Sequence, residues 1–388
     1  MRRAAALVLG IALLPTGCWW GSSPTHKHDS YVPYVPKYDI GTRPDSHAVT
    51  PPRVCSKVTC VTGEACVSTL AGDGTSGYLD GLAATARFDH PWAVAVDGQG
   101  WVYVSDHHNA RVRVIRNGVV STLAGSSSKG SVDGPSDKAR FSGIQGIDVD
   151  LANGTVYVAD REARKVRVIS QGYVSTLALS GTEETFDPTD VAIRDGLLHV
   201  VDFGNYNCWT CASRWPPHIG RVQQGGGALI VLPETYTEDP ATADLKAVHY
   251  LAQPQSVAVG VDGKIYMPTT KGIRVLAAGG AKLKEIEIHQ YFGLVFELAD
   301  LAVDAQGRMF GAIALNHRIA QVGADEKVTI IPPVPAVVEN ASKEYGCVDG
   351  PASVARFYMP QGVAVDAGGR RIYVADTGNE RIRVIDLP

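Results

Sequence analysis

Short apolar runs recur along the chain in a fixed order and predict β-strands. Residues 94–97, 102–106 and 111–115 read VAVD, VYVSD and RVRVI, and related triplets recur in five further copies. The runs are rich in Val, Ile and Tyr and are bounded by Gly, Asp and Asn, as strands and turns usually are. The first two runs of a copy are nearly continuously apolar, which is typical of strands buried on both faces. The third run alternates Arg or Lys with apolar residues, which predicts a half-exposed strand.

A fourth apolar run follows the third in five copies, and its counterpart for the sixth copy stands at the other end of the repeats. Residues 66–72, which begin at Cys66, read CVSTLAG and nearly repeat VSTLAG at 120–125. We expect 66–72 to be the outer strand of the last blade, which closes a ring and leaves no open sheet edge. The fold class is therefore all-β, a six-bladed β-propeller. An open solenoid or sandwich would not need its first strand beside its last.

The repeats resemble NHL repeats from about Cys66 to the end of the chain. Copies one, two and six match well and share a D-G-x4-A-R-F lead-in at residues 80–88, 133–141 and 349–357. The other three copies rest on strand order and spacing. The resemblance implies a rigid scaffold built mostly by the repeat residues, so function is expected where the copies differ.

The first residues predict export. Residues 1–17 carry two arginines, an apolar stretch and then small residues, as secretory signals do. Cys18 follows at once, so the segment resembles a bacterial lipoprotein signal, although Pro15 stands where Leu is usual. Cleavage before Cys18 would allow its lipidation, and Trp19 after it implies sorting to the outer membrane, facing either the periplasm or the surface. Plain secretion or an uncleaved segment is the alternative.

A linker is expected between the signal and the propeller. Residues 18–64 are rich in Pro and Tyr, with YVP at 31–33 and again at 34–36, and show no helical or strand period. They predict a semi-extended tether, or else a partner-binding segment that uses the YVP pair. The expected domains are thus a signal at 1–17, a tether at 18–64 and an NHL-like propeller at 65–388.

Cysteine usage is consistent with an oxidising compartment. With Cys18 lipidated, an even number of candidates for disulfides is left: Cys55, Cys60, Cys66, Cys208, Cys211 and Cys347. Sequence does not give their connectivity. The C-x-x-C at 208–211 favours a local bridge over zinc or redox chemistry, because no second C-x-x-C is present. Cys347 precedes the last blade, so a bridge to it from one of the first three cysteines would staple the ring.

The charge of the chain argues against nucleic-acid binding. The formal net charge is −4, whereas nucleic-acid-binding domains present basic surfaces. Partners are expected instead among envelope proteins, peptides or glycans, with membrane contact only through the lipid anchor. We expect a monomer.

Length variation between the copies gathers on one face. The long segments lie between fourth and first strands, at 73–91, 126–144, 236–254 and 333–360, and once between second and third strands, at 203–218. Alternating strands bring these loops to the same rim, and loops on a rigid scaffold usually carry binding. The richest insertion, 203–218, holds four residues of types enriched at interface hot spots: Tyr206, Trp209, Arg214 and Trp215. They could equally pack a small core of the insertion itself.

The residues just before each first strand should ring the mouth of the central channel. They are Trp92, Gln145, Thr189, Gln255, Ala299 and Gln361, with Asp190 and Asp300 one position further on. The resemblance extends to peptide-amidating lyases, which hold a metal by His near these positions, and to lactonases, which hold calcium by Glu, Asn and Asp. No ring position here is His, and the two aspartates are too few. We expect no metal, no cofactor and no catalytic residue.

Three histidines cluster in the upper loops of the first blade. His90, His107 and His108 lie near Asp106, and such a group could serve as a metal or acid–base site. Asp106, however, has counterparts in other copies, so we expect it to cap a turn, and we expect His107 and His108 to lie on an exposed loop.

The predicted function is that of a lipid-anchored envelope scaffold that binds a protein, peptide or glycan through its long-loop face. The alternative is an enzyme, either lyase-like or lactonase-like, at the channel mouth. A third possibility is a purely architectural role.

Overall fold

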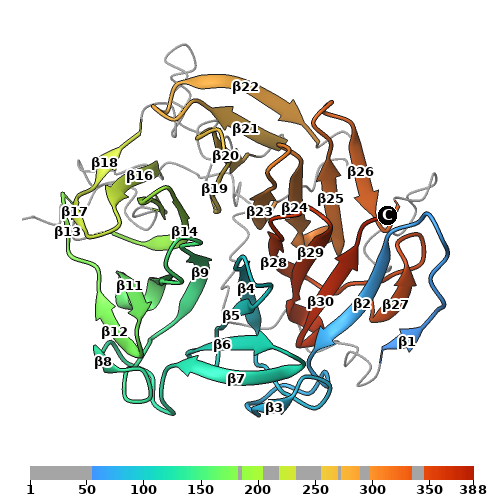
Figure 1. The fold of residues 1–388 in the computed structure, drawn as a ribbon, viewed down its shortest axis with the longest axis horizontal. Helices are drawn as coiled ribbons and strands as arrows, with labels where there is room; N and C mark the ends of the chain where they lie inside the picture. The colour runs from blue at the N-terminus through green and yellow to red at the C-terminus, as the bar shows by residue number, and fades with distance from the viewer. Residues whose placement is uncertain are drawn as a thin grey trace, which may run out of the picture. The chain divides into compact units, whose positions relative to one another are not determined.

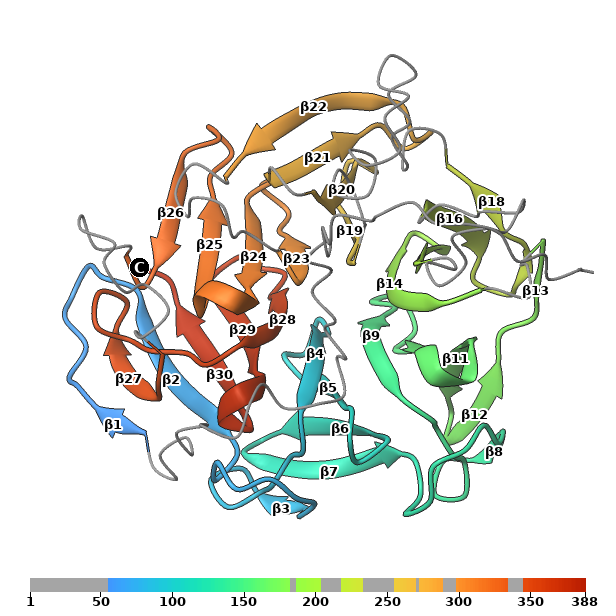
Figure 2. The ribbon, with the colours of Figure 1, turned by 180° about the vertical axis from the view of Figure 1, so that it is seen from behind.

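Six blades, each built on one β-sheet, surround a central axis in the computed structural model (Figures 1 and 2), and a further two-stranded sheet is present among the described residues. The structure describes residues 55–181, 186–203, 218–232, 255–269, 272–288, 298–333 and 345–388. The chain divides into two units, Met1–Val49 and Thr50–Pro388, and the propeller belongs to the second. Its described residues form strands and three short 3₁₀ turns without any α-helix, so they include no helix capable of crossing a membrane. The expected six-bladed β-propeller is confirmed.

Each blade is an antiparallel sheet of four strands, counted from the axis outward. The first three blades are β4 (Pro91–Val96), β5 (Val102–Asp106), β6 (Arg111–Arg116) and β7 (Val119–Ala124); β9 (Ile144–Val149), β10 (Val156–Asp160), β11 (Lys165–Ser170) and β12 (Tyr173–Thr176); and β14 (Pro188–Arg194), β15 (Leu197–Asp202), β16 (His218–Gln223) and β18 (Ile230–Val231). The next two are β19 (Ala258–Val259), β20 (Ile265–Pro268), β21 (Gly272–Leu276) and β22 (Lys282–Glu287); and β23 (Asp300–Val303), β24 (Met309–Ile313), β25 (Arg318–Val322) and β26 (Val328–Ile331).

The last blade joins the two ends of the repeat region, as predicted. It contains β28 (Pro360–Val365), β29 (Arg371–Asp376), β30 (Arg381–Asp386) and, from the N-terminal side, β2 (Cys66–Ala71). β2 pairs antiparallel with β30, with Cys66 opposite Asp386, and the two strands lie side by side in Figure 1. The predicted strand 66–72 is confirmed, except that Gly72 lies beyond its end.

Two disulfide bonds lie at this closure. Cys55 bonds to Cys347, and Cys60 bonds to Cys66. The first bond is the expected staple of the ring, and it accompanies a short parallel pairing of β1 (Ser56–Lys57) with β27 (Val348–Pro351). Contacts with the last blade therefore begin at Cys55, ahead of residue 65. The cysteines at 18, 208 and 211 lie outside the described residues.

A fifth strand lies outside the fourth in the three blades that carry the D-G lead-in, which the sequence did not predict. β3 (Gly81–Leu82) pairs with β7, β8 (Gly134–Pro135) pairs with β12, and β27 pairs with β2. Segments 73–91 and 126–144, expected to be free binding loops, thus fold back along their blades. A two-residue strand is too short to show a period, which explains why the pattern missed it.

One arginine is fully buried in the third strand of each blade that carries the D-G lead-in, so the expectation of half-exposed third strands is wrong there. Arg113, Arg167 and Arg383 have no exposed side-chain surface. In the second blade, Arg167 donates to Asp160 Oδ2 at 3.0 Å and to Asp133 Oδ1 at 2.7 Å. Each buried arginine thus pairs with one aspartate that ends the second strand and one from the D-G lead-in. The lead-in strand shields the arginine from solvent.

The fourth strands of the second and third blades are shorter than predicted. The run at 173–179 leaves its blade after β12, and β13 (Leu179–Ser180) pairs with β17 (Gly227–Ala228) of the next blade instead. Within the predicted run 228–234, only β18 pairs with its own blade.

The apolar core is divided among the junctions between blades. Six buried clusters are present, and each contains residues of two neighbouring blades. The cluster between the last and first blades, for example, holds Phe88 and Val104 together with Tyr373 and Ile382. A single blade therefore buries its faces only against its neighbours, as expected of a repeat architecture.

Candidate functional site

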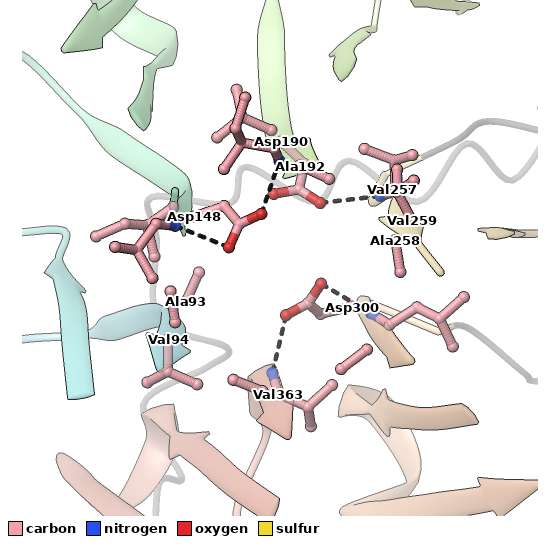
Figure 3. Close-up of a pocket in the computed structure, with 18 of the residues that line it drawn as sticks. Ala93, Val94, Asp148, Asp190, Ala192, Val257, Ala258, Val259, Asp300 and Val363 are labelled. Carbon is pink, nitrogen blue, oxygen red and sulfur yellow. Dashed lines mark hydrogen bonds between the residues drawn. The ribbon is translucent and has the colours of Figure 1, made fainter. Parts of the chain in front are cut away.

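The first strands of all six blades line a cavity of about 130 Å³ on the axis (Figure 3). Side chains two residues apart on a strand share a face, so equivalent positions in the six strands form rings. One ring consists of alanines with a single exception: Ala95, Asp148, Ala192, Ala258, Ala302 and Ala364. The ring two positions earlier contains Asp190, Asp300 and Ser256, together with one alanine and two glycines.

Three carboxylates enter this cavity, one more than the sequence predicted. Figure 3 shows Asp148, Asp190 and Asp300 pointing into the central space from β9, β14 and β23. Asp190 and Asp300 were predicted there. Asp148 was missed, because its run IDVD was compared with VAVD as a whole. Aligning the six runs column by column would have found it as the one residue in its ring that is not alanine.

The three carboxylates accept hydrogen bonds from the backbone of the following blade. Asp148 Oδ2 accepts from the Ile193 N–H at 2.7 Å, and Asp190 Oδ2 accepts from the Val257 N–H at 2.9 Å. Asp300 Oδ2 accepts from the Val363 N–H at 2.8 Å. Each aspartate therefore joins its own inner strand to the next one.

The second oxygens of two of these carboxylates also have partners. Asp148 Oδ1 accepts from the Val149 N–H at 2.8 Å. Asp300 Oδ1 accepts from the Leu301 N–H at 2.8 Å and from the Ser256 hydroxyl at 2.6 Å. The Ser256 bond connects the fourth blade with the fifth. Both carboxylates are thus occupied by groups of the scaffold itself.

The two remaining junctions are joined by hydroxyl groups. Ser105 Oγ donates to the Gln145 carbonyl at 2.5 Å, between the first and second blades. Thr377 Oγ1 donates to the Pro91 carbonyl at 2.6 Å, between the last and first blades. All six junctions are therefore crossed by a hydrogen bond from a polar side chain near the axis.

Burial changes the acidity of the channel carboxylates. Desolvation raises the pKa of Asp148 to about 6, against the pull of its two backbone hydrogen bonds and of Arg194. The pKa of Asp300 is also raised by desolvation, and that of Asp190 is raised well above its ordinary value by desolvation and by the charge of Asp300. The three groups thus resist carrying three negative charges in the cavity.

The channel does not fit the metal sites of similar propellers. Calcium takes six to eight oxygen ligands, whereas only three carboxylates line this cavity and both oxygens of Asp148 and Asp300 already accept N–H or O–H groups. Among the described residues, these three carboxylates do not form a group of ligand atoms that could share one ion. The group that does converge lies elsewhere and consists of Asp89, His90 and His108.

That group lies above the first blade, where the segment entering β4 meets the turn after β5. The His90 and His108 rings lie 3.9 Å apart, and both Nδ1 atoms approach Asp89 Oδ1. Glu380 reaches the group from the last blade, and its Oε1 lies 3.5 Å from His90 Nδ1. The sequence indicated the histidines but not Asp89 or Glu380, which is 290 residues from His90 along the chain.

The two remaining members of the predicted cluster have structural roles. His107 is buried and its Nδ1 lies 2.7 Å from the Ile144 carbonyl; desolvation lowers its pKa to about 4, so it stays neutral. Asp106 accepts from the Asp89 N–H at 2.8 Å and from the Asn109 side chain at 2.8 Å. Asp106 therefore ties the segment before β4 to the turn after β5 through a side chain, rather than capping backbone N–H groups of that turn as predicted. The expectation that His107 lies on an exposed loop is wrong, because the ring is buried, and His108 is half-buried.

The predicted rim residues differ in accessibility. Gln145 and Thr189 are buried, whereas Trp92, Gln255 and Gln361 are half-buried. Trp92 also contacts His107, with ring centroids 5.2 Å apart. The four predicted contact residues of the insertion, Tyr206, Trp209, Arg214 and Trp215, lie outside the described part of the chain. Their role in binding stays a prediction.

Comparison with known proteins identifies the repeats. The family model described as NHL repeat matches residues 88–115 and 357–385, which lie in the first and last blades. The chloroplastic protein SUPPRESSOR OF QUENCHING 1 of Arabidopsis thaliana is 25% identical over 346 residues, covering 79% of this chain and 31% of that protein. NHL repeat-containing protein 2 of Gallus gallus is 21% identical over 363 residues, covering 80% of this chain and 48% of that one. The chain spans less than half the length of either relative.

Solved structures share the fold at low sequence identity. A structural genomics protein from Bacteroides thetaiotaomicron superimposes with a TM-score of 0.59 and 17% identity, covering 83% of this chain and 76% of that one. A gluconolactonase from Xanthomonas campestris gives 0.53 and 16%, covering 89% and 99%. Virginiamycin B lyase from Staphylococcus aureus gives 0.51 and 13%, covering 84% and 100%. These similarities establish the propeller fold and no particular activity.

Proposed function

We propose, from the premise that the chain belongs to the NHL-repeat family of β-propellers, that it is an exported binding scaffold. Its ligand is a protein, peptide or glycan, held on the face where the segments entering the first strands meet the turns after the second strands. The two disulfide bonds support an oxidising compartment. Binding residues in proteins often lie on variable loops that a rigid scaffold holds in place.

One observation carries the choice of binding over catalysis. The polar side chains nearest the axis are engaged in hydrogen bonds that join neighbouring blades, as Asp148 and Asp300 illustrate with both carboxylate oxygens. A general acid or base must reach the substrate proton with a free atom. A cavity of about 130 Å³ is also below the range of about 300–1,000 Å³ that small-molecule sites occupy. The channel therefore serves to hold the blades together.

A hydrolase or lyase acting at the channel mouth is the second candidate. It is favoured by the raised pKa values of Asp148 and Asp300, since perturbed carboxyl groups cluster at catalytic sites. The gluconolactonase and the streptogramin-type lyase among the structural neighbours show that such propellers can be enzymes. Identities of 16% and 13% carry no activity over to this chain.

Two assays separate these candidates. The purified chain is tested for hydrolysis of gluconolactone and for opening of a streptogramin B ring, with and without Ca²⁺ or Mg²⁺. We expect no turnover above background. Turnover that requires a metal ion and disappears in Asp190→Asn or Asp300→Asn, while the variants remain folded, would refute the scaffold proposal in favour of the enzyme.

A capture assay tests the binding face directly. We expect the immobilised chain to retain a component of a cell-envelope extract, and the double substitution Trp209→Ala with Trp215→Ala to abolish retention without lowering the melting temperature. Retention that is unchanged in this variant would remove the insertion from the site. Trp92→Ala, at the half-buried rim of the channel, is the parallel test of the mouth.

Membrane attachment through lipidated Cys18 is a further part of the proposal. It rests on the sequence alone, in which an apolar stretch and small residues precede Cys18. Cys18→Ser should transfer the protein from the outer-membrane fraction of a two-membrane bacterium to the soluble fraction. A protein that stays in the membrane fraction after this change is held by something other than a lipid on Cys18.

A further inference from the structure

We propose that Asp89, His90, His108 and Glu380 form a binding site for one divalent transition-metal ion, with Zn²⁺ as the best fit. The site lies between the last and first blades, on the proposed binding face. It goes beyond the scaffold function, which requires no metal, and it departs from the metal-free chain expected from the sequence.

The distances between the ligand atoms agree with tetrahedral zinc. His90 Nδ1 and Asp89 Oδ1 lie 3.0 Å apart, and His108 Nδ1 and Asp89 Oδ1 lie 3.2 Å apart. His90 Nδ1 and Glu380 Oε1 lie 3.5 Å apart. Zinc bonds of about 2.0–2.1 Å place two tetrahedral ligands about 3.3–3.4 Å from each other. Asp89, His90 and His108 thus offer three ligand atoms within 4.8 Å of one another. Glu380, which lies near His90 but outside this group, must move closer to become the fourth ligand.

The donor set is the one that zinc and its neighbours in the periodic table prefer. Two imidazole nitrogens and two carboxylate oxygens suit Zn²⁺, Ni²⁺ or Cu²⁺ better than Mg²⁺ or Ca²⁺, which favour oxygen ligands alone. Both imidazoles direct the same ring atom, Nδ1, at one carboxylate oxygen, and their rings lie 3.9 Å apart. A cation between these atoms would bind two neutral imidazoles and balance the charge of the two carboxylates.

The repeat itself does not demand these residues. The same backbone bonds recur at other junctions: His108 N–H donates to the Asp89 carbonyl at 3.1 Å, and Gly378 N–H donates to the Tyr358 carbonyl at 2.8 Å. Gly378 and Tyr358 are the counterparts of His108 and Asp89 in the last blade, and neither can bind a metal ion through its side chain as those residues can. The backbone is thus common to the blades, whereas the ligands are particular to this junction.

The second blade provides the same contrast. Its counterparts of Asp89, His90 and His108 are Ser142, Gly143 and Glu162. Arg161 N–H donates to the Gly143 carbonyl at 3.0 Å, as His107 N–H donates to the His90 carbonyl at 3.2 Å. Only one of the three second-blade residues, Glu162, carries a side chain suited to zinc. Glu162 therefore supplies a matched position for a control substitution.

The scaffold holds the proposed ligands before any ion arrives. Glu380 is buried, with 7% of its side chain exposed; its Oε2 accepts from the His90 N–H at 2.7 Å, and its Oε1 lies 3.5 Å from His90 Nδ1. The backbone of Asp89 is fixed by its bond to Asp106. The side chains of Asp89, His90 and His108 are 22–29% exposed, so an ion can enter from solvent. Ligands fixed in this way bind with less loss of conformational entropy.

Zinc titration of the purified full chain tests the proposal. The protein is stripped with a chelator, dialysed, and titrated with Zn²⁺ against a chromophoric chelator to obtain stoichiometry and affinity. We expect His108→Ala and His90→Asn each to bind one equivalent fewer than the natural chain, or to bind that equivalent at least about tenfold more weakly. Asn suits position 90, where φ is +53°, because it tolerates the left-handed region.

Controls make the result specific to this junction. Glu162→Gln should bind as the natural chain does, and Asp190→Asn should too, because its carboxylate lies in the channel. Histidines 26, 28 and 47 are present in the natural chain and in every variant, so any zinc that they bind is the same in all of them. The difference in bound zinc between the natural chain and a variant therefore reports the proposed site alone. Zn²⁺ should also raise the melting temperature of the natural chain and of both controls, and raise it less in the two histidine variants.

Three results would overturn the site. One is the absence of zinc binding by the natural chain at micromolar free Zn²⁺. Another is equal stoichiometry and affinity in the natural chain, His108→Ala and His90→Asn. The third is loss of the ion in Asp190→Asn, which would move it to the channel. Unfolding of one histidine variant would show in its melting curve, and the other variant then decides.

Discussion

Replacing Asp148 by alanine should destabilise the protein much more at acidic than at neutral pH. Alanine occupies the same ring position in the other five blades, so the side chain is known to fit the inner strand. The substitution removes two hydrogen bonds, from Ile193 N–H and Val149 N–H. It also removes a carboxyl group whose pKa is raised by burial from 3.8 to about 6.

The magnitudes follow from these two effects. A buried N–H left without its acceptor costs about 1–3 kcal/mol, so the two lost bonds cost about 2–6 kcal/mol at any pH. Because the folded pKa of Asp148 exceeds the unfolded one, its contribution to the free energy of unfolding is greatest below pH 3.8 and falls as the pH rises to about 6. The fall amounts to about 3 kcal/mol. Asp148→Ala should therefore be clearly less stable than the natural chain near pH 4, and its deficit should shrink or vanish near pH 7.5.

Equilibrium unfolding in urea, followed by tryptophan fluorescence with the disulfides intact, measures this difference at several pH values. The control is Asp137→Ala, which removes an exposed carboxylate paired with its neighbour Lys138. The expected change in the stability difference between pH 4 and 7.5 is about 2.5 kcal/mol, because part of the full change lies below pH 4. A stability difference between the natural chain and Asp148→Ala that stays constant within about 0.5 kcal/mol over this range would refute the idea that the ionised Asp148 carboxylate destabilises the folded state.

Two further predictions concern the scaffold. Arg167→Met should lower the free energy of unfolding by about 3–5 kcal/mol, because it leaves Asp160 buried without its cation. The control Lys138→Met, at an exposed lysine, should change the free energy of unfolding by less than about 0.5 kcal/mol. Similar losses in both variants would contradict a stabilising role for the buried ion pair. Removing the Cys55–Cys347 bond by double serine substitution should cost more than removing Cys60–Cys66 in the same urea assay. The sequence separations are 292 and 6 residues, for which the chain-entropy model gives about 5–6 and about 2 kcal/mol; an equal or inverted order would show that strain or residual structure outweighs chain entropy.

The repeats made most of the fold predictable. Six copies of a strand pattern indicate the blades, and the near identity of 66–72 with 120–125 indicates how the ring closes. Pairings that depend on two or three residues were not visible, such as the fifth strands at Gly81–Leu82 and Gly134–Pro135. The same alternation of Arg with apolar residues describes both an exposed strand face and a buried face whose arginines find acidic partners. Only the structure shows that Asp133 covers Arg167 from a loop 34 residues away.

The candidate sites were less predictable, for a similar reason. Asp190 and Asp300 could be placed in the channel because a repeat position implies a place in the ring. Asp148 could have been found by the same logic. The approach of Glu380 to His90 depends on a left-handed residue, with φ of +55° at Glu380, that aims the side chain across the junction. The order of blades predicts that these two loops are neighbours, but not that their side chains meet.

The disulfide between Cys55 and Cys347 has a mechanical consequence. A pull on the chain ahead of Cys55 reaches this bond before it reaches β2, the strand that closes the ring. The force then passes through a covalent link to Cys347 and into the start of β27, rather than peeling β2 from β30 one hydrogen bond at a time. The non-covalent joint between β2 and β30 is thereby kept out of the path of tension. If the segment before Cys55 is a tether, force from a bound partner can act on the propeller without separating β2 from β30.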